Sequence, residues 1–296
     1  MAAGRAHTDP MTEIVTGVDG SDGSAAALRW AVQEGRLRDR PVTAVLAWGL
    51  LDQHHLPGHE AFDPSYGDKE AQEALAAAVE AAVGAETAAT VGQRVVCDLP
   101  ARALIEASAR ADLLVVGARG LGGFHSLLTG SVSEQCLHHA TCPVAVVRAT
   151  PVPTVGVERI VIGTDGSDAA QAALHWALGE ARLRHATVQL IHAWQPAFVG
   201  GDSFLPVPAD SDAMAEVAEH LLERAVAAED SDGIAIERTE VCAAAPSALM
   251  DAAAGASLVV VGSRGRGGFA GLLLGSVSQQ VAQHAPCPVV VIPHGR

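Results

Sequence analysis

Two patterns of apolar positions alternate along the chain. Residues 13–18 form a short apolar run that predicts a β-strand, and residues 22–39 place apolar side chains at helical spacing. The same alternation predicts further strands over 42–48, 92–97, 112–117 and 143–148, and helices over 68–88, 100–110 and 131–140. Strands that alternate with helices indicate right-handed crossovers and a parallel sheet covered on both faces.

This pattern occurs twice. The segment that begins EIVTGVDGSDGS at Glu13 matches RIVIGTDGSDAA at Arg159 with an offset of 146, and ADLLVVGARG at Ala111 matches ASLVVVGSRG at Ala256 with an offset of 145. The chain is therefore a tandem duplication. We predict α/β domains over residues 12–149 and 158–296, a linker over 150–157 that contains two prolines, and a flexible tail over 1–11.

Charge and composition exclude several classes of protein. The 296 residues include 19 basic and 34 acidic side chains, a net charge of −15, which argues against a nucleic-acid binder or a polybasic membrane anchor. The chain has no apolar run of the length that spans a bilayer and no apolar signal-peptide core, so we expect a cytoplasmic protein. The single lysine, Lys69, lies far from any glycine-rich loop, which excludes a Walker P-loop and a protein kinase.

A glycine pattern recurs in both copies. Gly117, Gly120 and Gly130 have the spacing Gly-x-x-Gly, nine residues, Gly, and Ser131 follows directly; the second copy has Gly262, Gly265, Gly275 and Ser276. Glycines let backbone N–H groups approach a ligand, and a helix N-terminus adds a partial positive charge, so the pattern predicts phosphate binding. As an alternative, Ser131-x-x-Glu134 and Ser276-x-x-Gln279 also have the form of capping boxes, which would explain the serines without a ligand.

With this spacing, and with Asp19 and Asp165 in GVDGS and GTDGS at the end of the first strand of each copy, the chain resembles the nucleotide-binding branch of the universal stress protein family over nearly its whole length. The resemblance implies two tandem doubly wound (Rossmann-like, flavodoxin-like) domains, each with a five-stranded parallel sheet of order 3-2-1-4-5. The aspartate and the glycine loop would then flank the topological switch point, where open α/β sheets bind ligands. In the family that ligand is ATP.

The resemblance also assigns candidate site residues. Backbone groups of the glycine loop and the following helix would hold phosphates and ribose, the ends of the first strands would border the adenosine, and one alanine on each second strand would face adenine. The aspartates would contact adenine, ribose or a bridging Mg²⁺; the alternative is that they serve only the turn or the helix N-terminus. An arginine inside each loop could reach phosphate, or could be a solvated loop residue. The full set is Val18, Asp19, Ala47, Gly117, Arg119, Gly120, Gly130, Ser131, Val132 and Ser133 in the first copy, and Thr164, Asp165, Ala193, Gly262, Arg264, Gly265, Gly275, Ser276, Val277 and Ser278 in the second.

Other motifs give weaker support for a ligand or metal site. Gly265 to Ala270 fits a dinucleotide fingerprint, but it follows the fourth strand and its counterpart does not fit. His54, His55 and His59 lie in a Pro/Gly loop and have no counterparts, so we expect no metal site there. Cys142 and Cys287 precede core strands and are expected to be buried.

Three functions remain open at this point. We favour a non-enzymatic regulator that binds ATP, alone or with Mg²⁺, in each half and senses adenine nucleotide under stress. The alternatives are a slow ATPase or phosphotransferase that uses an aspartate with a metal, and an interaction module without nucleotide. We further expect the halves to form a pseudo-dimer through their last apolar strands. Dimerisation of whole chains is favoured by the resemblance alone, and the sequence identifies no regulatory protein partner.

Overall fold

The computed structural model describes residues 13–49, 66–120, 130–149, 158–195, 211–266 and 273–293. The predicted tail and linker lie outside these residues, as do His54, His55, His59 and most of the proposed dinucleotide fingerprint. In the first half the elements are β1 (Ile14–Gly17), α1 (Asp22–Arg38), β2 (Val42–Trp48), α2 (Asp68–Val83), α3 (Ala85–Ala88), β3 (Gly92–Cys97), α4 (Pro100–Ala107), β4 (Leu113–Gly117), α5 (Ser131–His139) and β5 (Val144–Val147). In the second half they are β6 (Arg159–Gly163), α6 (Asp168–Arg184), β7 (Thr187–Trp194), α7 (Ser211–Ala227), β8 (Ile236–Cys242), α8 (Ala245–Ala253), β9 (Leu258–Gly262), α9 (Ser276–His284) and β10 (Val289–Ile292).

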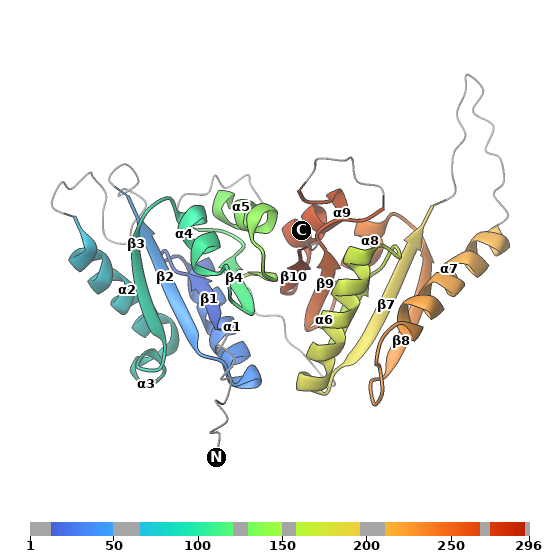
Figure 1. Cartoon of the computed structure of the whole chain (residues 1–296), viewed down its shortest axis with the longest axis horizontal. Coiled ribbons are helices and arrows are strands. Elements are labelled where there is room, and N and C mark those ends of the chain that lie inside the picture. Colours follow the sequence, from blue (N-terminus) through green and yellow to red (C-terminus); the bar gives the residue numbers. More distant parts are fainter. Residues whose placement is uncertain are drawn as a thin grey trace, which may run out of the picture.

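The two halves share one ten-stranded sheet, whose order is β3-β2-β1-β4-β5-β10-β9-β6-β7-β8 (Figure 1). Within each half the strands are parallel and follow the predicted order 3-2-1-4-5. The single antiparallel pairing joins β5 to β10, with Ala145 opposite Val290. The predicted pairing of the last strands is therefore confirmed, and it turns two five-stranded sheets into one.

Helices cover both faces of this sheet. One apolar core lies under α1, α2, α6 and α7 and contains Leu28, Leu75 and Leu174, all fully buried. The other lies under α4, α5, α8 and α9 and contains Leu104 and Val281. Strands β4 and β9 are apolar throughout because they contribute side chains to both cores.

One predicted helix is interrupted. The stretch over 68–88 forms two helices, α2 and α3, because Gly84 adopts a φ of 79° and ends the first of them. The other boundaries of the first half agree with the expectation to within a few residues, and β2 and β3 have the predicted bounds.

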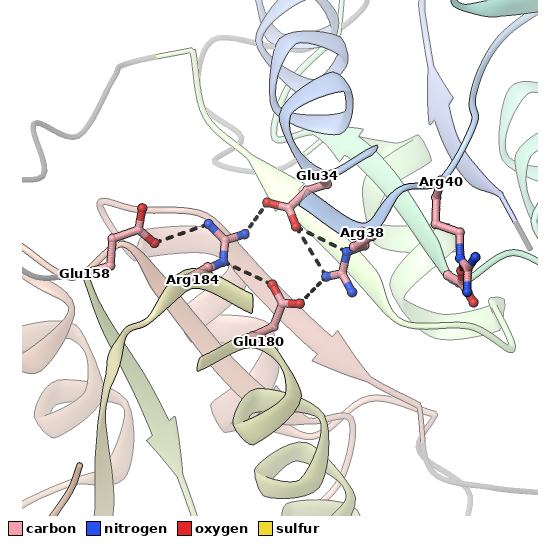
Figure 2. Close-up of polar contacts among 7 residues, drawn as sticks. Glu34, Arg38, Arg40, Glu158, Glu180 and Arg184 are labelled. Carbon is pink, nitrogen blue, oxygen red and sulfur yellow. Dashed lines mark hydrogen bonds and ion pairs between the residues drawn. The ribbon is translucent and has the colours of Figure 1, made fainter. Parts of the chain in front are cut away.

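We call the contact region between the halves, where β5 pairs with β10, the joint. Charged side chains connect α1 and α6 across this joint. Arg38 is paired with Glu180, and Arg184 with Glu34, and each arginine also lies within ion-pair distance of the glutamate four residues earlier on its own helix (Figure 2). We call Glu34, Arg38, Glu180 and Arg184 the charge network. The two glutamates are 1% and 2% exposed, so the network is part of the core of the interface.

Candidate functional site

The turn after each first strand is built around an aspartate. Asp19 follows β1, and its Oδ1 accepts hydrogen bonds from the backbone N–H (3.0 Å) and the hydroxyl (2.6 Å) of Ser21. Ser21 is in turn the N-cap of α1 and accepts from the Ser24 N–H at 3.1 Å. Asp165 and Ser167 repeat this arrangement before α6. The serine of D-G-S, present in both copies, is a signal for this turn that reasoning about the ligand passed over.

The glycine loop lies directly against that turn. A Cβ on Gly120 would lie 2.3 Å from Asp19 Oδ2, and one on Gly265 would lie 2.3 Å from Asp165 Oδ2. In the second half, the backbone N–H of Arg266 also donates to Asp165 Oδ2 at 2.6 Å. The structure thus brings each predicted aspartate together with the second glycine of its loop, and a side chain at that glycine would require the aspartate or the loop to shift.

The first glycine of each pattern allows a helix to approach the strand. A Cβ on Gly117 would lie 2.6 Å from the carbonyl carbon of Gly23, in the first turn of α1, and one on Gly262 would lie 2.7 Å from the same atom of Ala169. Sequence reasoning assigned these glycines to ligand binding. The structure shows that they allow close packing of the first helix against the fourth strand, and their contact with a ligand stays a prediction.

The third glycine begins the helix. Gly130 is the N-cap of α5 and Gly275 that of α9, and no side chain of the described residues caps either helix start. The capping-box alternative is therefore wrong, because Ser131 and Ser276 lie one position inside their helices and are exposed. The buried hydroxyls of Ser133 and Ser278 instead donate to the carbonyl oxygens of Gly117 and Gly262, both at 2.6 Å.

The start of each helix has room for a Cβ atom. Among the described residues, a Cβ on Gly130 would make ordinary van der Waals contacts at 3.7 Å and beyond, and one on Gly275 at 3.4 Å and beyond. The first N–H groups of a helix attract an anion through their donors and the positive end of the dipole. This uncapped and open helix start fits a phosphate group. Val132 and Val277, half-buried, belong to the same first turn.

The ends of the first and second strands lie at the same edge of the sheet. The Val18 N–H donates to Val45 at 2.9 Å and the Thr164 N–H to Ile191 at 2.8 Å. Ala47 and Ala193 lie two residues further along the second strands and are half-buried. One difference between the halves here is His192, which bonds through Nδ1 to the Thr164 carbonyl oxygen at 2.8 Å, whereas Leu46 is its counterpart in the first half.

Both glycine loops contain arginine. Arg119 is exposed and Arg264 half-buried. Arg266 spans the second site, because its guanidinium donates to the Gly166 carbonyl oxygen at 2.6 Å while its backbone donates to Asp165. Partial burial raises the pKa of Asp165, but hydrogen bonds from Ser167 and Arg266 outweigh burial and hold that pKa below its usual value. Asp165 therefore carries a charge at neutral pH.

Other expectations concern metals, thiols and membranes. In the described ranges, no cluster of three or more His, Cys, Asp or Glu side chains could hold a metal ion. Cys142 and Cys287 are buried, as predicted. None of the helices in the part of the chain that the structure describes combines the length and apolarity needed to cross a bilayer.

Comparisons with known proteins agree with this architecture. The profile of the universal stress protein family matches residues 11–148 and again residues 156–293. A universal stress protein of Mycobacterium tuberculosis is 34% identical over 289 residues, which cover 94% of this chain and 95% of the relative. One of Mycolicibacterium smegmatis is 34% identical over 291 residues, with 94% and 96% covered.

A solved structure extends the likeness to three dimensions. The crystal structure of a universal stress protein from Archaeoglobus fulgidus is similar with a TM-score of 0.66 at 21% identity, covering 96% of this chain and 99% of that one. The fold and the site define a tandem α/β protein with an open helix start in each half. The chain belongs to the universal stress protein family.

Proposed function

We propose that each half of the chain binds one molecule of ATP, and that the protein acts as a regulator that responds to adenine nucleotide under stress. The observation that carries the proposal is the start of α5 and of α9. In the part of the chain that the structure describes, each begins at a glycine with room for a Cβ atom, has no side-chain cap and lies beside an arginine. These features suit the phosphates, with Arg119 and Arg264 as counter-charges.

The remaining candidate residues suit the nucleoside. The Val18, Ala47, Thr164 and Ala193 positions lie at the edge where the crossovers of β1 and β4 diverge, and there an open α/β sheet offers a crevice for adenine and ribose. Asp165 Oδ2 accepts from the Arg266 N–H and has a second lone pair that could accept from a ribose hydroxyl. A Mg²⁺ ion would come with the phosphates, with Asp19 and Asp165 as the carboxylates that could contact it.

We infer binding without efficient turnover. Both oxygens of Asp165 already accept hydrogen bonds from backbone N–H groups, at 3.0 Å from Ser167 and 2.6 Å from Arg266. A carboxylate held in this way, with a lowered pKa, is a weak general base. We therefore expect bound ATP to outlast purification and ADP release to be slow.

Titration calorimetry of the nucleotide-free chain with ATP, with and without Mg²⁺, tests the proposal. We expect two molecules per chain, one with Gly130→Glu, one with Gly275→Glu and none with both. Each position accepts a Cβ atom without a clash, and the added carboxylate repels phosphate while favouring the helix dipole. Ala85→Glu, an added acid in the exposed first turn of α3, is the control.

Circular dichroism and thermal unfolding confirm that the variants fold. Two molecules of ATP retained by the folded double variant would refute the phosphate assignment. ATP bound by neither the wild type nor the control would favour the interaction module, and rapid release of ADP would favour the ATPase.

A further inference from the structure

Helix α9, whose first turn is the candidate phosphate site of the second half, is held at both ends by the first half. At its first turn, Gln279 Nε2 donates to Glu134 Oε1 at 3.2 Å, and Glu134 occupies the equivalent position in the first turn of α5. At its carboxyl end, Arg148 Nε donates to the Ala285 carbonyl oxygen at 2.7 Å. Arg148 Nη2 donates to those of Ala282, at 3.2 Å, and of Gln283.

Arg148 is a helix cap supplied from the other half. The last carbonyl groups of a helix lack partners within it and carry the negative end of its dipole, so a cation there stabilises the helix. Most such caps come from the same helix. Here the cap follows β5, which pairs with β10 across the joint, so the position of β5 relative to β10 decides whether the cap forms.

The same arginine is connected to the candidate site of the first half. The Val147 carbonyl oxygen, directly before Arg148, accepts from the Ala118 N–H at 2.7 Å, and the Ala118 carbonyl oxygen accepts from the Gly130 N–H at 2.8 Å. These two hydrogen bonds link the end of β5 to the glycine loop and then to the start of α5.

Charge connects the same groups. Burial, and then the nearby cation of Arg119, lowers the pKa of the Arg148 guanidinium. The Arg119 cation therefore disfavours a second cation at the position of Arg148. An anion bound beside Arg119 would offset this repulsion and stabilise the Arg148 guanidinium where it contacts the carbonyl groups of α9.

We propose that the two nucleotide sites are coupled, so that ATP in the first half increases the affinity of the second half through Arg148 and the Glu134–Gln279 contact. The proposal rests on the proposed function. By linkage, ATP in the second half increases the affinity of the first half by the same factor. The contact of Arg148 with α9 has no counterpart in the second half. The residue equivalent to Arg148 there is Pro293, which has no donor group.

Calorimetry measures the coupling without the need to decide which site binds ATP first. The product of the two ATP association constants of the wild type is divided by the product of the constants of the single-site variants Gly130→Gln and Gly275→Gln. Glutamine fills the same open space as glutamate but adds no charge that could stand in for the ligand. We expect a ratio of about 5 or more, the lower end of typical allosteric couplings.

The ratio is then measured again in three backgrounds. We expect it to fall to about 1 with Arg148→Gln, to recover in part with Arg148→Lys, and to keep its wild-type value with Arg110→Gln, an exposed arginine of the first half. Two ATP molecules per chain with a wild-type ratio of 1 or below would overturn the coupling and leave the proposed function intact. A ratio that Arg148→Gln leaves unchanged would also overturn it, and absence of ATP binding would instead refute the proposed function.

Discussion

Arg38 and Glu180 form an ion pair across the joint between the halves, with 2.5 Å between Nη2 and Oε1. The guanidinium carbon of Arg38 also lies 5.3 Å from the centre of the Trp176 ring, which adds a cation–π contact. Arg184 and Glu34 form the equivalent pair (Figure 2). Each half thus presents the same Glu-x-x-x-Arg patch at the end of its first helix, and the two patches are complementary to each other.

Removal of one charge from this network should be costly. With Arg184→Met, Glu34 and Glu180 keep their buried charges with one cation fewer, and we expect a loss of about 3–5 kcal/mol in the free energy of unfolding. Arg182→Met is the matched control, because Arg182 is exposed and pairs with the exposed Asp230. The control should cost at most about 1 kcal/mol. Urea unfolding measures both, and equal losses would contradict a special contribution from the network.

Low pH should reduce the free energy of unfolding through Asp165, a residue of the candidate site in the second half. Its pKa in the folded chain lies below the unfolded value of about 3.9, so the ionised carboxylate stabilises the fold above that pH. The contribution is lost as the pH falls through the folded pKa. We therefore expect Asp165→Asn to destabilise the chain at neutral pH and to lose less stability than the wild type between pH 5 and 3. Asp251→Asn, at an exposed aspartate, should follow the wild type in urea unfolding over this range.

The thiols should divide into two groups. Burial raises the pKa of Cys136 to about 12 and that of Cys287 to about 11, and it also raises the pKa of the buried Cys142. Cys97 and Cys242 are exposed. Because the thiolate is the reactive form, iodoacetamide at pH 8 should label two cysteines in the folded chain and all five in urea. Mass spectrometry gives the count and the sites; rapid labelling of Cys136 would contradict its burial.

The two kinds of glycine should respond differently to alanine. Gly120→Ala places a Cβ against Asp19 Oδ2 and should destabilise the fold by about 1–3 kcal/mol. Gly130→Ala meets open space at a helix N-cap and should cost less than about 1 kcal/mol. Thermal unfolding separates the two. A smaller loss for Gly120→Ala than for Gly130→Ala would show that the loop relaxes away from Asp19.

The helices and strands could be predicted well from the sequence because each pattern of apolar positions occurs in two copies. The bounds of β2 and the order of the strands follow from apolar runs and from the topology of the family. The start of α5 was harder, since Ser131-x-x-Glu134 fits a capping box although the helix begins one residue earlier, at Gly130. A pattern of residue types does not say which backbone N–H groups are already satisfied.

The pairing of β5 with β10 could be predicted, but the side-chain contacts across the joint could not. Arg148 and the Ala285 carbonyl oxygen are 137 residues apart, and any carbonyl group at a helix end is an equal candidate until the sheet has formed. The same holds for Gly120, whose contact with Asp19 depends on the turn after β1. The spacing indicated that these glycines matter, but only the packing separates those required by the fold from those that leave room for a ligand.

The contact between Glu134 and Gln279 has a consequence for how such a protein can vary. In a symmetric dimer of identical subunits, the same residue occupies this position on both sides of the two-fold axis. A glutamate there would therefore face another glutamate and repel it. In a single chain the two sides are encoded separately, and glutamate can meet glutamine. Likewise, Arg148 can act on one side while proline occupies the other. Fusion therefore permits the two halves to diverge at equivalent positions, which two copies of one gene product cannot do.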